Sequence, residues 1–237
     1  MTTPSALSEA PLGVELGRQV VSVGFLLGDH DAVIAELASL DAPGMPGRAV
    51  AKRKAEFLAG RLAAQRALSG LGIDALPGRN DDGSPSWPTA VVGSITHGAG
   101  RALCAVSRKT ELRSLGIDAE RLMAASVSEE LKARICSPAE RALLAQLRAP
   151  EHHLVTFAFS AKESLYKCLY PLVGKFMDFS AARVVEASGT ADAASFRGAL
   201  TLELDVDWSA EFRRGQRLRA AISASDNHVE SAVLLPL

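Results

Sequence analysis

The spacing of the apolar residues changes repeatedly along this chain, and this constrains its fold more than any other feature. Residues 49–71 and 154–172 repeat apolar residues with the period of a helix. Residues 20–27, 91–107 and 196–237 instead have the short apolar runs and the alternation of strands. The predicted order is strand, helices, hairpin, strand, then helices and strands again, which is typical of an α+β fold.

This order divides the chain into two parts of similar length. We place the boundary near residues 110–115, before the apolar run that leads into a further short strand. The two parts have a loosely similar order of elements, although no repeat is visible residue by residue. We therefore expect two α+β halves, residues 1–112 and 113–237.

Local signals predict where several elements begin and end. Asp29 is a suitable N-cap for the helix that follows it. Two further pairs have the spacing of capping boxes, and Pro138 occupies the favoured first helical position. Residues 76–88 are rich in turn formers and predict a loop, and residues 1–18 look loosely ordered. The capping pairs are Ser126 with Glu129 and Ser137 with Glu140, and the segments 196–208, 216–225 and 228–237 predict an antiparallel meander.

The composition excludes several classes of protein. A formal net charge of −1 provides no overall field that would attract nucleic acid or an anionic membrane, so an anionic ligand needs a local basic cluster. Cys104, Cys136 and Cys168 are an odd number and lie in apolar stretches, which indicates buried thiols rather than disulfides or a zinc site. No apolar stretch reaches the length of a membrane span, and the N-terminus lacks the pattern of a signal peptide, so we expect a cytoplasmic protein.

The segment "GIDAE", residues 116–120, carries the sharpest chemical signal. On a strand, Asp118 and Glu120 point to the same face, where their charges repel unless a cation or a basic group lies between them. Carboxylate oxygens of this kind suit Mg²⁺ together with phosphate and water. The alternative is that the strand simply ends here and its acids are solvated, and both interpretations stay open.

Basic residues form a second signal, in the first half of the chain. The helix "KRKAEFLAGRLAAQR" carries Arg53 and Arg61, and arginine is well suited to a terminal phosphate. Its alternative is a solvated helix face with ion pairs to Glu56. Arg79, in the following loop, has the same two interpretations. His97, in "GSITH", lies where a strand meets its turn. It either holds a phosphate, acts as an acid or base, or has no role.

The helix "FSAKESLYKCLY", residues 159–170, carries the last signal. Ala161, Leu165 and Cys168 lie on its apolar face, whereas Glu163 and Lys167 lie four residues apart on the other side. Such a pair is most often a surface ion pair worth a few tenths of a kcal/mol. Taken together with the other segments, it instead contributes a carboxylate and an ammonium to a phosphate-handling site.

In this order and spacing, four segments resemble the larger, pseudodimeric 4′-phosphopantetheinyl transferases named for surfactin synthetase. Within that family the chain looks most like the enterobactin synthetase component D branch. The segments are "RKAEFLAGRLAA" (53–64), "WPTAVVGSITH" (87–97), "GIDAE" (116–120) and "FSAKESLYK" (159–167). The first 50 and last 60 residues are less diagnostic.

The resemblance implies a pseudodimer of two similar halves, with the active site in the cleft between them. It implies transfer of phosphopantetheine from coenzyme A to a serine of an acyl or peptidyl carrier protein, with Mg²⁺. The N-terminal half would bind the 3′-phosphate and adenine end, and the C-terminal half would carry the magnesium ligands and the catalytic helix. The product would be adenosine 3′,5′-bisphosphate, and the pathway nonribosomal peptide, siderophore or polyketide synthesis. The pseudo-symmetry suggests a monomer.

The resemblance also implies roles for individual residues. Asp118, Glu120 and Glu163 match magnesium-binding carboxylates, and Glu163 also matches a general base for the carrier serine. Asp118, Glu163 and Lys167 form the expected catalytic set. The groups expected at coenzyme A are Lys162, Lys167 and His97 near the pyrophosphate, Arg53, Arg61 and Arg79 near the 3′-phosphate and adenine, and Thr96.

Two other functions remain as alternatives. One is a magnesium-dependent hydrolase of a nucleotide pyrophosphate, which would consume coenzyme A without a carrier protein. The other is a non-catalytic relative that binds carrier proteins, and the complete set of carboxylates and lysines argues against it. Which carrier the protein would modify is not readable from the sequence.

Overall fold

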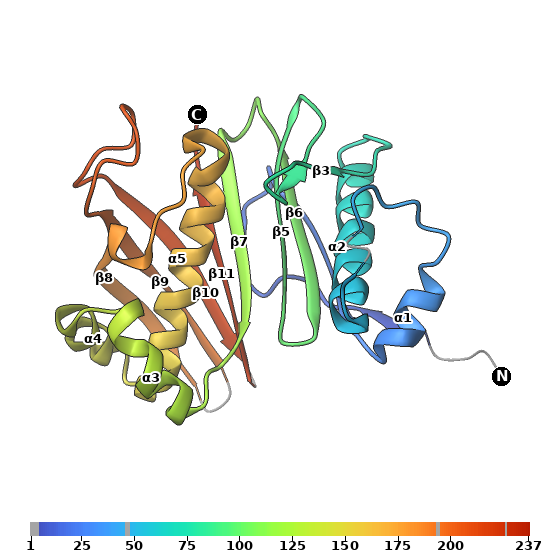
Figure 1. Cartoon of the computed structure of the whole chain (residues 1–237). Helices are drawn as coiled ribbons and strands as arrows, with labels where there is room; N and C mark the ends of the chain where they lie inside the picture. Colours follow the sequence, from blue (N-terminus) through green and yellow to red (C-terminus); the bar gives the residue numbers. More distant parts are fainter. Residues whose placement is uncertain (1–4, 46–47, 193–194, 226) are drawn as a thin grey trace. The chain divides into compact units, whose positions relative to one another are not determined.

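The computed structural model describes residues 5–45, 48–192, 195–225 and 227–237 (Figure 1). The chain forms two compact units. Unit 1 contains the chain up to Leu12 and the segment Gly17–Arg113, together with Leu237. Unit 2 contains Gly13–Leu16 and Ser114–Pro236. The predicted halves, 1–112 and 113–237, differ from these units mainly because Gly13–Leu16 packs with unit 2, where the Gly13 amide donates a hydrogen bond to the Glu230 carboxylate.

Unit 1 is built on a four-stranded antiparallel sheet in the order β1-β2-β6-β5. The long helix α2 contacts β2, β5 and β6, and α1 packs against α2. Two very short strands, β3 and β4, pair in the loop before β5. The strands are β1 (Leu7–Glu9), β2 (Val21–Leu27), β3 (Gly78–Arg79), β4 (Pro85–Ser86), β5 (Val91–Gly98) and β6 (Arg101–Arg108), and the helices are α1 (His30–Glu36) and α2 (Ala51–Gly70).

Small side chains bring α2 close to its sheet. Ala55, Ala59, Ala63 and Ala67 recur every four residues and are fully buried. At Gly60 an added Cβ would lie 3.0 Å from Ile95 on β5, so this position has little room for a larger side chain. Alanine also has the highest helix propensity, which explains why this segment forms a long helix. The contact with β5 places the polar edge of α2 next to His97.

Unit 2 is built on a five-stranded antiparallel sheet in the order β7-β11-β10-β9-β8. The helix α5 crosses one face of this sheet and contacts β7, β11 and β10, while α3 packs on α5 and α4 on β8 (Figure 1). The strands are β7 (Ser114–Arg121), β8 (Ala182–Ala191), β9 (Ser195–Leu204), β10 (Arg217–Ser225) and β11 (His228–Leu235), the α-helices are α3 (Ala125–Ile135), α4 (Pro138–Leu144) and α5 (Glu151–Val173), and two short 3₁₀ helices, η1 (Ala145–Leu147) and η2 (Phe179–Ala181), flank α5.

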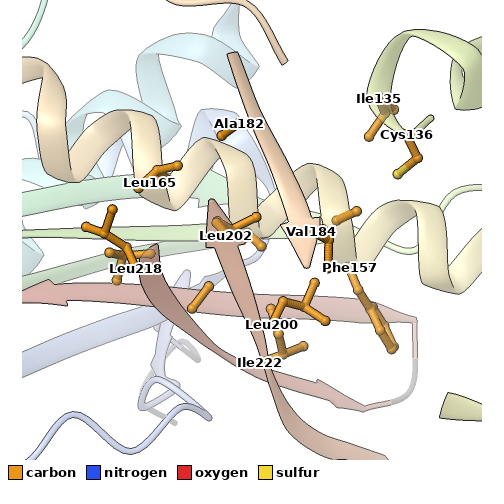
Figure 2. Close-up of a cluster of buried hydrophobic side chains, with 14 of the residues drawn as sticks. Ile135, Cys136, Phe157, Leu165, Ala182, Val184, Leu200, Leu202, Leu218 and Ile222 are labelled. Carbon is orange, nitrogen blue, oxygen red and sulfur yellow. The ribbon is translucent and has the colours of Figure 1, made fainter. Parts of the chain in front are cut away.

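The core of unit 2 lies between α5 and the sheet (Figure 2). Phe157 and Leu165 of α5 face Leu200 and Leu202 of β9 and Ile222 of β10. The inward residues of β9 and β10 alternate with outward polar ones, as expected for a sheet covered on one face. This packing fixes which edge of α5 faces the sheet.

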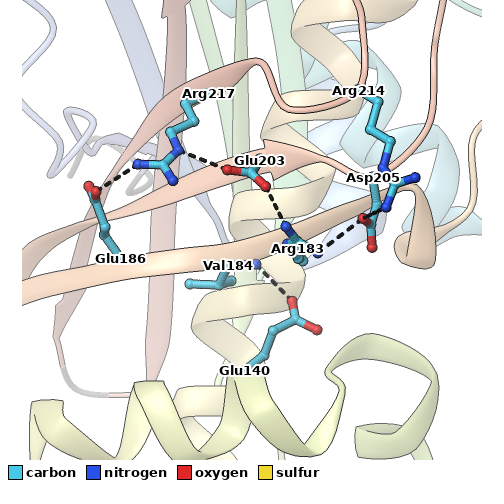
Figure 3. Close-up of polar contacts among 8 residues, drawn as sticks. All are labelled: Glu140, Arg183, Val184, Glu186, Glu203, Asp205, Arg214 and Arg217. Atoms are coloured by element: carbon cyan, nitrogen blue, oxygen red, sulfur yellow. Dashed lines mark hydrogen bonds and ion pairs between the residues drawn. The ribbon is translucent and has the colours of Figure 1, made fainter.

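Charged side chains from β8 to β10 pair with one another away from this core (Figure 3). Arg217 lies 2.8 Å from Glu203 and 3.2 Å from Glu186, and Arg183 lies 3.2 Å from Asp205. The arginines are about half exposed, so each pair contributes little to stability.

The two units share part of their topology, which confirms the prediction of two similar α+β parts. In unit 1 the first long strand, β2, pairs antiparallel with the last strand, β6. In unit 2 the first strand, β7, pairs antiparallel with the last strand, β11. In both units one long helix packs on the sheet that contains this pair, although the pair is central in unit 1 and includes the edge strand β7 in unit 2.

The local predictions have mixed outcomes. The Asp29 cap and the capping box of Ser137 and Glu140 are confirmed. The capping box of Ser126 and Glu129 is wrong, because α3 begins earlier, with Ala124 as its N-cap and no side-chain cap. Residues 1–18 contain β1, the loop 76–88 contains β3 and β4, and β8 was not predicted.

The cysteine prediction is confirmed, since all three thiols are free and buried. Within the described ranges, none of the helices combines the length and the apolar character that a membrane crossing requires.

Candidate functional site

The predicted functional residues form two groups, one in each unit. In unit 1 the basic residues line a small pocket between α2, the β3–β4 loop and β5. The pocket contains every basic residue that the sequence predicts in this unit, and it has Phe57 and Ile95 as its apolar wall. Its lining residues are Arg53, Glu56, Phe57, Arg61, Arg79, Gly83, Pro85, Ile95 and His97.

Arg53, His97 and Glu56 form a polar cluster at one end of this pocket. Arg53 donates a hydrogen bond to the His97 ring, and its guanidinium lies 2.5 Å from Nε2 and 3.2 Å from Nδ1. The Glu56 carboxylate lies 3.7 Å from His97 Nδ1 and 3.9 Å from the Arg53 guanidinium. The predicted ion pair with Glu56 therefore exists, and it joins Arg53 to His97 in one cluster. About half of the Arg53 side chain is exposed, which leaves the guanidinium accessible to an anion.

Arg61 is the buried basic group of the pocket, with only 4% of its surface exposed. Its guanidinium lies 4.8 Å from the centre of the Phe57 ring, which is a cation–π distance. Burial lowers the pKa of Arg61, and the positive charge of Arg79 lowers it further. Both effects penalise its charge, so an anion that entered the pocket would be bound favourably.

Arg79 and Thr96 have different surroundings. Arg79 is exposed, lines the same pocket and donates a long hydrogen bond of 3.4 Å to the Gly44 carbonyl. Thr96 is buried and alternates with His97 along β5, so it faces the opposite side of the strand and does not line the pocket. The predicted coenzyme contact of Thr96 stays a prediction.

In unit 2, β7 and α5 bring the predicted catalytic set together. Lys167 Nζ lies 2.6 Å from Asp118 Oδ1. Asp118 is almost fully buried, at 2% exposure, whereas 27% of the Lys167 side chain is exposed. A buried carboxylate needs a counter-charge, and Lys167 provides it from the solvent side.

Glu163 belongs to the same electrostatic group. Burial raises the pKa of Glu163, the nearby Lys167 ammonium lowers it, and the negative charge of Asp118 raises it again, with a net increase. Glu163 therefore does not simply form a surface ion pair, which is the bland interpretation of the Glu163–Lys167 spacing. Glu120 is partly exposed further along β7, on the strand face predicted for it.

The residues that the structure describes do not form a complete three-ligand metal centre. Among the described residues, no group of three His, Cys, Asp or Glu side chains is arranged to hold a metal ion. Magnesium, however, usually binds one or two protein carboxylates and takes its remaining ligands from water and phosphates. Asp118 and Glu163 are candidates for that mode, because both are carboxylates and the helix α5, which carries Glu163, packs on the strand β7, which carries Asp118.

Lys162 lies in an environment that the sequence did not indicate. Its ammonium lies 2.8 Å from Glu140 Oε1 and donates to the carbonyls of Ile135 and Phe179 at 2.7 and 3.1 Å. Only 4% of the side chain is exposed. These contacts tie α5 to α3, α4 and η2. The phosphate contact expected for Lys162 stays a prediction, and any such contact would compete with this network.

An apolar pocket opens next to Glu163. It holds about 500 Å³ of empty space, part of it open to solvent. Apolar and aromatic side chains predominate in its wall, and Phe176 is largely exposed at its rim. The lining residues are Lys162, Glu163, Leu165, Tyr166, Phe176, Met177, Asp178, Phe179, Ala182 and Trp208.

Sequence reasoning missed Phe57 and Glu140. Phe57 lies four residues before Arg61, and this spacing predicts that the two side chains meet on one helix face. Glu140 was recognised as part of a capping box, and its second role could not be seen because its partner Lys162 lies on another helix.

Comparison with known proteins agrees with these observations. Residues 45–107 match the family model described as the 4′-phosphopantetheinyl transferase N-terminal domain. Residues 114–223 match that of the 4′-phosphopantetheinyl transferase superfamily. The two matches fall within units 1 and 2, respectively.

Individual relatives point the same way. The chain is 41% identical to 4′-phosphopantetheinyl transferase Svp of Streptomyces mobaraensis over 64% of this chain and 67% of that protein. It is 40% identical to enterobactin synthase component D of Salmonella typhi, over 59% and 57%. It is 36% identical to 4′-phosphopantetheinyl transferase PptT of Mycobacterium tuberculosis, over 71% and 78%.

The shared segments thus span between about half and four fifths of these relatives. These relatives include enterobactin synthase component D, the branch that the sequence motifs predict. With both family models matched and more than two thirds of one such relative covered, the chain belongs to the 4′-phosphopantetheinyl transferase superfamily.

Proposed function

We propose that this protein transfers 4′-phosphopantetheine from coenzyme A to a serine of an acyl or peptidyl carrier protein, with Mg²⁺. The observation that carries the proposal is the group formed by Asp118, Glu163 and Lys167 on β7 and α5, in a chain of this superfamily. It combines carboxylates for a metal, an ammonium for phosphate and a carboxylate with a raised affinity for protons.

The reaction joins the carrier serine to the phosphopantetheine phosphorus. The serine oxygen forms a bond to this phosphorus, and the bond to the bridging oxygen of the pyrophosphate breaks. The leaving group is adenosine 3′,5′-bisphosphate, and the serine proton passes to a base. Phosphoryl transfer of this kind depends mainly on positioning and on neutralising charge.

Glu163 is the base in this proposal. A serine hydroxyl is a weak nucleophile, so a group that accepts its proton accelerates the attack. Burial and the charge of Asp118 make Glu163 a better proton acceptor than an ordinary surface glutamate. Its place beside the apolar pocket leaves room for an organic substrate chain next to the carboxylate.

Asp118, Glu120 and Glu163 are the proposed magnesium ligands. When bound, the metal would polarise the pyrophosphate oxygens and neutralise their charge. Lys167 forms an ion pair with Asp118 in the protein without ligands. Because its ammonium is partly exposed, it would also contact the pyrophosphate of bound coenzyme A. Lys167 would then stabilise the negative charge that develops on the leaving phosphate.

The basic pocket of unit 1 would hold the 3′-phosphate and adenine end of coenzyme A. Arg61 offers a guanidinium that lacks full hydration, and Arg53 and Arg79 add exposed charges around it. His97 carries a hydrogen-bonded ring at the edge of the pocket and would contact the pyrophosphate. An aromatic side chain, Phe57, lies in the same pocket.

The proposed setting is nonribosomal peptide, siderophore or polyketide synthesis in the cytoplasm, with the protein acting as a monomer. The name of one relative, enterobactin synthase component D, supports a peptide-synthesis setting.

The test is the intact mass of an apo carrier protein incubated with this protein, coenzyme A and Mg²⁺. We expect a mass gain of one phosphopantetheine, and we expect EDTA to abolish it. Loss of coenzyme A without modification of any carrier would instead identify a pyrophosphate hydrolase. Binding of coenzyme A and carrier with no turnover would identify a non-catalytic relative.

A further inference from the structure

We propose that Ser231, Ser160 and Ser164 form a hydroxyl cluster that fixes the position of α5 on its sheet, and with it the position of Glu163 and Lys167 relative to Asp118. In this proposal Ser231 is a positioning residue for the catalytic group. The effect on transfer rests on the proposed function, whereas the effect on the Lys167–Asp118 contact does not.

The three hydroxyls lie in the interface between α5 and β11. Ser231 Oγ lies 2.8 Å from Ser160 Oγ and 2.5 Å from Ser164 Oγ. Ser231 also donates to the backbone carbonyl of Ser160 at 2.8 Å. All three residues are fully buried.

The hydrogen bonds of Ser231 are complete. If its single proton is donated to the Ser160 carbonyl, the two helix hydroxyls donate to the two lone pairs of its oxygen, and all three contacts are satisfied together. This arrangement uses the one donor and both acceptor sites of the Ser231 hydroxyl. It requires two helix hydroxyls that lie one turn apart. A displaced helix would break at least one of these bonds, so the cluster selects one rotation and one height of α5.

The cluster lies close to the catalytic group. Ser231 pairs directly with Asp118 in the register of β11 and β7. On the helix, Ser164 follows Glu163 and precedes Lys167 by three residues. The hydroxyls therefore join the strand beside Asp118 to the helical turn that carries Glu163 and Lys167.

Two further contacts fix the distance between α5 and β7. A Cβ added at Gly116 would lie 2.1 Å from the Ser164 carbonyl oxygen, so the helix backbone rests directly on the glycine. Ser114 lies two residues before Gly116 on the same face of β7, and its hydroxyl donates to the Cys168 carbonyl at 2.5 Å. The glycine limits how close the helix comes, and the hydroxyls determine its rotation.

Stability alone does not explain this polar interface. A buried hydrogen bond contributes little net stability, and apolar groups of the same shape in place of both partners are nearly neutral. Hydrogen bonds are directional, however, whereas apolar packing is not. A helix rotated by about 10° moves a side-chain end near its surface by about 1 Å, and an error of that size costs a reaction about 100-fold.

The test compares two variants of the cluster with a control on the same helix. Ser231→Ala leaves the helix hydroxyls without their acceptor, so we expect it to lower both stability and kcat. The triple variant Ser160→Ala, Ser164→Ala and Ser231→Ala removes all three polar groups together. We expect the triple variant to recover most of the lost thermal stability while kcat stays about 10- to 100-fold low and KM for coenzyme A stays unchanged.

Thr156→Val is the control. Thr156 is a buried residue of α5, about two turns before Glu163. Its hydroxyl donates to the His152 carbonyl at 2.7 Å and accepts from the Met123 amide at 3.1 Å. This variant should lose stability with no change in kcat. Recovery of kcat together with stability in the triple variant would overturn the proposal, and so would an equal loss of kcat in the control.

A second readout needs no turnover. The coupling between Lys167→Met and Asp118→Asn is measured from unfolding free energies, once in the wild-type protein and once with Ser231→Ala. We expect the coupling to fall by at least about half when the cluster is broken, because the 2.6 Å contact depends on the position of α5. An unchanged coupling would contradict the positioning role even if the protein proved to have another activity.

Discussion

The helices α2 and α5 have equivalent places in their units but are attached to their sheets by different means. Both are long helices that pack on a sheet whose first long strand pairs with its last. α2 contacts its sheet through Ala55, Ala59, Ala63 and Ala67, and no hydroxyl on that face ties it to a strand by a described hydrogen bond. α5 instead uses Ser160 and Ser164 with Ser231.

The two kinds of attachment correspond to the different functions that we propose for the two helices. α2 presents arginines to a pocket, and long arginine side chains can adjust to a bound phosphate. α5 presents Glu163 and Lys167 to Asp118, where a reaction tolerates little displacement. We infer that the same arrangement of a helix on a sheet has two uses. A helix packed through alanines is sufficient for binding, whereas a helix held by directional hydrogen bonds suits catalysis.

The largest expected effect tests the catalytic role of α5. Glu163→Gln should lower kcat for carrier modification about 10³-fold, because it removes the proposed base while it keeps the side-chain shape. The melting temperature should change by about 2 °C or less. Intact mass of the carrier over time gives the rate, and Glu151→Gln, on the same helix and half exposed, is the control that should keep full activity.

Glu140→Gln tests the attachment of α5 to α4 and should cost about 3 kcal/mol at pH 7, because it leaves the Lys162 ammonium buried without its counter-charge. Burial alone would raise the pKa of Glu140, but Lys162 and the amides of Val184 and Ser137 lower it overall. The stabilisation is therefore present above the unfolded-state pKa of about 4.3 and is lost as the pH falls through the lower folded value.

Urea unfolding at several pH values checks this prediction. The difference in unfolding free energy between the wild-type protein and Glu140→Gln should shrink as the pH falls from about 4.3 towards the lower pKa of folded Glu140, because Glu140 becomes protonated over this range. A difference that stays constant with pH would rule out the ion pair as its source. Glu129→Gln, which changes an exposed partner of Lys132, is the matched control with little effect.

Arg61→Met tests the binding role of α2. It should raise KM for coenzyme A about tenfold with little change in kcat, because it removes one charged hydrogen-bond donor to the 3′-phosphate. With dephospho-coenzyme A, which lacks that phosphate, the variant and the wild-type protein should differ much less. Arg66→Met, on the same helix and outside the pocket, is the control. An equal loss with both substrates would place the role of Arg61 elsewhere.

The smallest effect concerns the exposed charges of unit 2. Arg217→Gln should leave the midpoint of urea unfolding almost unchanged, because water screens the contacts of Arg217 with Glu203 and Glu186. Transfer activity should be unaffected. A measurable loss of activity would mean that this surface takes part in the reaction, for example in binding the carrier.

The sequence allowed prediction of those features that depend on local order. The helical periods of α2 and α5 and the strand carrying Asp118 follow from residue spacing. The contact between Lys167 and Asp118 was not predicted, because the two residues are 49 positions apart; the family resemblance only placed both in the expected catalytic set. β8 was missed because the segment 182–191 is rich in small and polar residues and has no clean alternation.

Tertiary contacts account for what could not be predicted. Lys162 and Glu163 are adjacent charged residues in the sequence. In the structure Lys162 is buried against Glu140, whereas Glu163 borders an open pocket. The partner of Lys162 is on another helix, so no local pattern reveals it. The serines of the hydroxyl cluster have the same property, since Ser231 is 67 residues from Ser164 and they meet only once α5 packs on β11.

The most direct test of this division of roles is a binding titration with adenosine 3′,5′-bisphosphate in the presence of EDTA, which requires neither carrier nor turnover. We expect Arg61→Met to weaken binding about tenfold, whereas Glu163→Gln should bind as tightly as the wild-type protein or more tightly. If Glu163→Gln lost the ligand while Arg61→Met kept it, recognition would belong to α5, and the assignment of binding to α2 and of chemistry to α5 would be contradicted.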